Sequence, residues 1–173
     1  HADVDKLRQA FGGAVPEGPT DSATVVAELV QAAEDGLVAM TGPRYFGFVI
    51  GSSLPAAAAA DMLTTAWDQN TLSYVMSPAA AVAEETAARW LLDLLRLPPT
   101  GSVGLVTGAT MANFTGLAAA RHHVLAAAGW DVETDGLYGA PEVHVVVGAD
   151  RHASLDLALR YLGFGSGRVH EVP

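Results

Sequence analysis

Apolar residues recur at helical spacing in the first part of the chain. Their period predicts a helix over residues 20–39, with three polar candidates for its cap at residues 20–22. Pro55 suits the first position of a second helix, which reaches about residue 68. Residues 41–53 hold three glycines and a proline, which predict an irregular segment with one short extended piece. We therefore expect residues 1–76 to form an N-terminal helical and irregular segment.

From residue 77 onward, short apolar runs alternate with longer helical patterns. Ser77-Pro78 predicts a helix that starts with a capping hydroxyl, has Arg96 in its last turn and stops at Pro98-Pro99. The other predicted elements are strands at 101–106, 143–147 and 168–172, helices at 110–128 and 152–162, and a loop at 131–141. This alternation predicts a three-layer α/β arrangement with a mostly parallel sheet, of which residues 77–173 form an incomplete part.

Composition excludes several classes of protein. Half of the residues are hydrophobic and only 16% are charged, which excludes a disordered chain. The formal net charge of −10 argues against binding to nucleic acid or to an anionic membrane. There is no cysteine, so thiol catalysis and cysteine-based zinc sites are excluded, and a cytosolic location is expected. The apolar stretch at 54–66 is too short to span a bilayer, and both ends read as cuts in a longer protein.

A tight turn between a predicted strand and a predicted helix carries the first candidate chemistry. The strand ends at Thr107, and the helix opens at Thr110, so unpaired N–H groups and the Thr110 hydroxyl could hold a phosphate. The alternative is an ordinary turn in which Thr110 is a plain cap. A dinucleotide fingerprint would need glycines where Ala112 and Phe114 stand, so a single phosphate suits this turn better.

Four stretches stand in a characteristic order and spacing. They are Gly42-Pro-Arg-Tyr-Phe-Gly47, Ser77-Pro-Ala79, Thr107-Gly-Ala-Thr-Met-Ala-Asn113 and His152-Ala-Ser-Leu155. Together they resemble the group II pyridoxal-phosphate-dependent amino-acid decarboxylases, relatives of the aromatic-amino-acid and glutamate decarboxylases. The resemblance covers residues 42–173. It implies fold type I, the aspartate-aminotransferase-like α/β fold, and a homodimer with active sites at its interface.

The resemblance also implies roles for single residues. Ala109 and Thr110 would hold the phosphate of the cofactor, pyridoxal phosphate, and His152 would stack on its pyridine ring. Three residues fall near the segment that contacts the substrate in this family: Phe48, Val49 and Ile50. Gly42 stands where many relatives have His, and Met111 where many have Glu, which bears on substrate range more than on chemistry.

The histidines differ in what they can do. His152 directly follows a predicted strand, at the edge where parallel sheets place ligands, so its ring could face the cofactor and exchange protons with the substrate. The alternative for His152 is a helix cap or a surface residue. His122 and His123 are adjacent on a helix and point about 100° apart, which makes a poor metal pair. His144 is expected to be buried in its strand, and no set of residues has metal-ligand spacing.

Lysine is nearly absent from the chain. Pyridoxal chemistry needs a lysine amine that binds the cofactor covalently. Eight of the nine basic residues are arginines, and the sole lysine, Lys6, precedes the resemblance. In the family, this lysine and the aspartate that pairs with the pyridine nitrogen lie beyond the region that matches. The segment alone is therefore expected to be inactive.

These observations favour the N-terminal part of a decarboxylase that removes the α-carboxylate of an L-amino acid to give an amine and CO2. An open sheet edge and uncovered apolar helix faces predict a second copy, a complementary C-terminal fragment, or both. Two alternatives remain. One is another carbon–carbon lyase on the same scaffold, and the other is a truncated, non-catalytic paralogue that acts as a dimerising or regulatory subunit.

Overall fold

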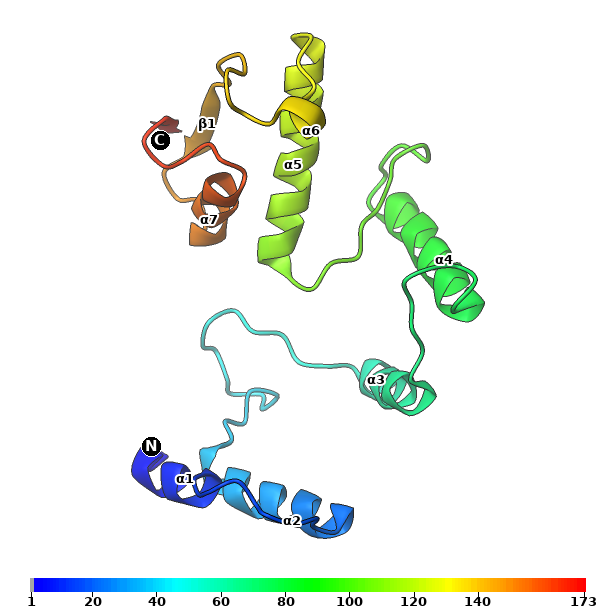
Figure 1. Cartoon of the computed structure of the whole chain (residues 1–173), viewed down its shortest axis with the longest axis vertical. Helices are drawn as coiled ribbons and strands as arrows, with labels where there is room; N and C mark the ends of the chain where they lie inside the picture. The colour runs from blue at the N-terminus through cyan, green and yellow to red at the C-terminus, as the bar shows by residue number, and fades with distance from the viewer. Residues whose placement is uncertain (1) are drawn as a thin grey trace. The chain divides into compact units, whose positions relative to one another are not determined.

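The computed structural model describes residues 2–173, and its contacts divide the chain into two compact units (Figure 1). The first unit ends at Asp68, and the second is Gln69–Pro173. Each unit is described by itself below. The division reflects contacts within this chain, and the domain boundary between residues 76 and 77 stays a prediction for the intact protein.

The first unit is helical, as expected. It contains α1 (Val4–Phe11), α2 (Ser22–Ala33), the short 3-10 helix η1 (Glu34–Gly36) and α3 (Pro55–Trp67). Of the three candidate caps for α2, Asp21 is the one used: its carboxylate accepts the N–H groups of Ala23 and Thr24 at 3.1 and 3.2 Å. The predicted helix over 20–39 is correct in place but ends as η1. The helices α1 and α2 pack on each other, and none of α1, α2 and α3 has a fully buried residue.

The segment between η1 and α3 is irregular, as predicted, and the short extended piece predicted within it does not pair as a strand. Residues 41–53 contain no strand, and Phe48 and Val49 adopt left-handed backbone angles, with φ of 57° and 54°. A strand needs a hydrogen-bonded neighbour, and none pairs with this apolar run in the described chain. The segment therefore presents consecutive apolar side chains from a bent backbone.

The second unit contains the α/β part. Its elements are α4 (Pro78–Leu94), α5 (Ala109–Ala127), α6 (Val132–Asp135), β1 (Val145–Gly148), α7 (Ala153–Tyr161) and β2 (Val169–Val172). The two strands are parallel neighbours in register from Val145–Val169 to Gly148–Val172, and α7 connects them. This strand–helix–strand unit confirms the parallel pairing that the alternating pattern predicts.

The core of this unit forms where α5 packs against α7 (Figure 1). Leu125 of α5 and Leu159 of α7 are each only 1% exposed, and Ala158 is fully buried. Val147 of β1 and Val132 of α6 are also buried. Burial of these side chains stabilises the unit, and it holds the two helices in a defined relation to each other.

Several local predictions in the second unit are wrong. Residues 101–106 form no strand, because no neighbouring strand pairs with them in the described part of the chain. His144 precedes β1 and is exposed instead of buried, and its ring lies 5.8 Å from that of His170. The Ser77 hydroxyl makes no capping bond, although α4 starts as predicted. The same helix ends at Leu94, so Arg96 lies outside its last turn.

A short helix, α6, interrupts the predicted loop at 131–141. The Asp131 carboxylate accepts hydrogen bonds from the N–H groups of Glu133 and Thr134 and from the Thr134 hydroxyl. These bonds, led by the one from the Thr134 hydroxyl, lower the pKa of Asp131 below its ordinary value. The sequence signal for this helix was an acidic residue that can cap it, because its carboxylate can accept hydrogen bonds from the N–H groups two and three residues later.

Apolar side chains remain exposed on α3 and α4. Met62 and Leu63 of α3 are exposed, as are Trp90 and Leu94 of α4. Within residues 2–173, no helix combines the length and the apolar character needed to cross a bilayer.

Candidate cofactor site

The amino-terminal end of α5 is open to a ligand. Gly108 occupies the cap position and Ala109 the first helical position, so the helix starts one residue earlier than predicted. Thr110 therefore lies in the first turn and is not the cap, which corrects the plain-cap alternative. No side chain caps this end, and the first N–H that bonds within the helix is that of Ala112, to the Gly108 carbonyl at 3.0 Å. The earlier N–H groups and the exposed Thr110 hydroxyl are donors suited to an anion.

His152 lies at the start of α7, just past the carboxyl end of β1. It is the N-cap of α7, and its Nδ1 accepts the N–H of Ser154 at 3.2 Å. The Ser154 hydroxyl oxygen lies 2.8 Å from the same Nδ1. The structure thus confirms the helix-cap alternative for His152. This alternative and a cofactor contact are compatible, since capping uses only Nδ1 and leaves Nε2 and both ring faces available.

A hydrogen bond joins the starts of the two helices. Asn113 Nδ2 of α5 donates to Ser154 Oγ of α7 at 2.9 Å. Asn113 follows Ala109 by four residues and Thr110 by three, so it shares a helix face with both. Sequence reasoning missed the link, although both partners fall inside the stretches that carried the resemblance. The available signal was that each is a polar residue in a mostly apolar helix.

A second contact defines the direction of the two helices. Arg121 Nη1 donates to the Leu162 carbonyl at 3.0 Å. The pairs Asn113–Ser154 and Arg121–Leu162 are both separated by 41 residues, so α5 and α7 run in the same direction. Their amino-terminal ends therefore lie at the same end of the pair. The structure brings the first turn of α5, with Ala109 and Thr110, to the same edge as His152.

Arg151 fixes the turn that carries His152. Its Nε lies 2.8 Å from Asp156 Oδ1, and its Nη1 lies 2.7 Å from Glu171 Oε2 and donates to the Gly148 carbonyl at 3.3 Å. Hydrogen bonds to Glu171 and then to Asp156 raise the pKa of Arg151 above its ordinary value, so the side chain stays charged. One residue thus ties the end of β1, the first turns of α7 and the strand β2 together.

The predicted substrate residues lie in the first unit. Phe48 is 91% exposed, Val49 is fully exposed and Ile50 is partly exposed. The role of these three residues stays a prediction.

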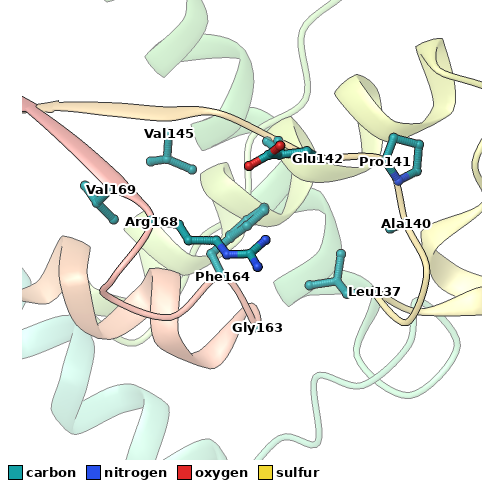
Figure 2. A pocket seen from close by; sticks show the side chains of 10 residues that line it. Leu137, Ala140, Pro141, Glu142, Val145, Gly163, Phe164, Arg168 and Val169 are labelled. Carbon is teal, nitrogen blue, oxygen red and sulfur yellow. The ribbon is translucent and has the colours of Figure 1, made fainter.

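A separate cavity of about 160 Å³ lies away from these groups. Figure 2 shows Glu142 and Arg168, the charged residues of its lining, and Phe164 next to Arg168. Val145 and Val169, the first residues of β1 and β2, also line it. The cavity is therefore at the amino ends of the strands, opposite the edge that carries His152. Ligands of parallel α/β sheets bind at the carboxyl edge, so this cavity is not assigned to the cofactor.

The donors present fit a planar, phosphate-bearing group. The uncapped first turn of α5 supplies N–H donors and a hydroxyl for a phosphate. The imidazole of His152 supplies a flat face at the same edge, held by Ser154 and Asn113. The one lysine, Lys6, lies in α1 of the other unit.

Comparison with known proteins agrees with this chemistry. The family described as "Pyridoxal-dependent decarboxylase conserved domain" matches residues 5–173. The aromatic-L-amino-acid decarboxylase of Bacillus atrophaeus is 26% identical over 162 residues, which cover 94% of this chain and 32% of that protein. The chain thus spans about a third of the length of this relative.

Solved structures show the fold. The glutamate decarboxylase domain of the diaminobutyrate-pyruvate transaminase and L-2,4-diaminobutyrate decarboxylase from Vibrio parahaemolyticus matches with a TM-score of 0.89 at 21% identity, over 98% of this chain and 38% of that chain. Oryza sativa TDC, solved with PLP and tryptamine, matches with a TM-score of 0.77 at 24% identity, over 96% and 37%. These matches confirm that the chain is part of a fold type I α/β scaffold. The chain belongs to the pyridoxal-dependent decarboxylase family, whose cofactor is pyridoxal phosphate.

Proposed function

We propose that this chain is the N-terminal part of a decarboxylase that acts on an L-amino acid. In the overall reaction, the bond to the α-carboxylate breaks, CO2 leaves, and a proton takes its place to give the amine. The observation that supports the proposal most is the Asn113–Ser154 bond, which joins the start of the helix that bears the predicted phosphate donors to the start of the helix that bears His152. The family match supports the same chemistry.

In this proposal, the residues of this chain bind the cofactor and orient it. The N–H groups of Ala109 and Thr110, with the Thr110 hydroxyl, would hold the phosphate at the positive end of α5. The ring of His152 would stack on the pyridine ring of the cofactor. Pyridoxal phosphate, when bound, supplies the electron sink for carboxylate loss. The Nε2 atom of His152 is then available to exchange a proton with the substrate.

The bent segment at residues 48–50 contributes to the substrate site in this proposal. A β-branched residue such as Val49 rarely adopts a positive φ, and such strain persists only where surrounding groups hold it. The exposed Phe48 beside it offers a large apolar contact. An occupant that covers both side chains, a substrate or a second copy of the chain, would account for this conformation.

The site is completed from outside this chain. The covalent lysine and the acidic partner of the pyridine nitrogen are contributed by the C-terminal part, so the segment alone is inactive. The exposed apolar side chains of α3 and α4 support a covering partner, which we take to be that part and a second copy of the protein. The acidic, cysteine-free composition favours a cytosolic location.

Product analysis tests the proposal. The full-length protein, incubated with pyridoxal phosphate and each L-amino acid in turn, is expected to release equal amounts of amine and CO2 from at least one substrate. Cleavage of another carbon–carbon bond would assign the protein to a different lyase. Absence of any product with all substrates would favour the non-catalytic subunit.

Replacement of the phosphate-binding hydroxyl tests the cofactor site. In the full-length protein, Thr110→Ala is expected to weaken pyridoxal phosphate binding about tenfold or more, because a hydrogen bond to a charged group contributes roughly 1.5–3 kcal/mol. The dissociation constant is measured by titration of the cofactor-free protein. Thr110→Ser, which keeps the hydroxyl, is the matched control and should bind nearly as well as the parent. Equal weakening in both variants would contradict the role of the hydroxyl.

A further inference from the structure

We propose that Asn113 and Ser154 are positioning residues that fix the orientation and the proton of the His152 ring. The inference rests on the proposed function, because it concerns the ring that faces the cofactor there. The three residues form one continuous path: Asn113 Nδ2 to Ser154 Oγ at 2.9 Å, and Ser154 Oγ to His152 Nδ1 at 2.8 Å. The path starts on the helix that holds the phosphate and ends on the ring.

The chemistry of the donors sets the direction of each bond. The amide nitrogen of Asn113 only donates, so Ser154 Oγ accepts from it. The backbone N–H of Ser154 also only donates, so His152 Nδ1 accepts from it. A neutral ring whose Nδ1 accepts carries its proton on Nε2. The Ser154 hydroxyl proton is then directed to Nδ1, and all three bonds run toward that atom.

This arrangement gives the ring one defined donor. The Nε2 N–H has no hydrogen-bond partner among residues 2–173, so it is the group left to act on a substrate. A proton on Nδ1 would instead point at the N–H of Ser154. Two bonds to one nitrogen also restrict rotation of the ring about its Cβ–Cγ bond.

The path is not needed to dock the two helices. Ser154 is only 7% exposed, so its hydroxyl must be satisfied, but α5 and α7 are also joined by the buried Leu125 and Leu159 and by the Arg121–Leu162 bond. The Arg121 contact lies about two turns farther along both helices and does not touch His152. A variant that removes it separates loss of helix packing from loss of ring positioning.

The experiment compares four variants of the full-length protein by nitrogen NMR of the histidine rings, before cofactor is added. They are Asn113→Asp, Ser154→Ala, the double variant and Arg121→Met. An aspartate has the size of asparagine, but its carboxylate only accepts hydrogen bonds. The Ser154 hydroxyl would therefore donate its hydrogen bond to the aspartate and turn an oxygen lone pair toward Nδ1. We expect the parent to show the Nε2–H form of His152, and Asn113→Asp to raise the fraction protonated at Nδ1. We expect Arg121→Met to keep the parent signal.

The double variant isolates the hydroxyl path. In the Ser154→Ala background, the aspartate should no longer change the His152 signal, because the coupling passes through the missing oxygen. Turnover of Asn113→Asp should fall roughly tenfold, with cofactor affinity changed far less, since misplacement of a reacting group affects kcat. An unchanged His152 signal in Asn113→Asp, or an equal change in both backgrounds, would overturn the proposal. The NMR result does not depend on amine formation, so failure of the proposed function is separately visible.

Discussion

Replacement of His152 by alanine is expected to lower turnover of the full-length protein by about a hundredfold or more, because a positioned acid–base group contributes on that order. Cofactor retention should fall much less, since stacking is one contact among several while placement of the ring governs the reaction. The measurement is amine production at saturating substrate, together with a cofactor titration of the same variant.

His123→Ala is the matched control, because His123 is exposed on α5 and makes no contact with the His152 path. Its turnover should equal that of the parent. If His152→Ala has the same turnover as this control, the role assigned to His152 is wrong, and the proposed function would rest on the phosphate turn and the family match alone.

The second large effect is on stability. Leu159→Ala should reduce the free energy of unfolding by about 2–5 kcal/mol, because it opens a cavity in the α5–α7 core, where Leu159 is 1% exposed. Urea unfolding of the full-length protein, followed by circular dichroism, measures the change. Leu159→Met keeps the volume and should cost less than about 1.5 kcal/mol. Equal losses in the two variants would show that cavity formation is not the cause.

Local signals in the sequence were sufficient for most helices. Pro55 and Pro78 marked the starts of α3 and α4, and Asp21 was among the candidate caps of α2, because these preferences depend on a few neighbouring residues. The parallel pair β1–β2 followed from alternating patterns with a helix between them. The helix starts and the cap are decided within one or two turns of chain, and the strand pair within one strand–helix–strand unit.

Features that depend on distant residues were not accessible in the same way. The apolar run at 101–106 resembles a strand, but strand formation requires a hydrogen-bonded neighbour that local sequence does not specify. For His152, the sequence was compatible with a cofactor contact and with a helix cap or surface position, and local pattern does not distinguish these roles. The Asn113–Ser154 bond spans 41 residues and exists only because α5 packs on α7. Ala109, Thr110 and His152 were identified by resemblance and turn geometry, whereas the link between them required the fold.

The contacts of Arg151 have a consequence for the energetics of ligand capture. Its side chain joins the end of β1, α7 and β2 entirely through residues of this chain. The loss of conformational entropy needed to hold the backbone at His152 therefore accompanies folding and does not oppose binding. Under the proposed function, a cofactor that binds at this edge would meet a preorganised ring, so more of its interaction free energy would appear as affinity. Weakening the Arg151 contacts would transfer that ordering cost to the binding step.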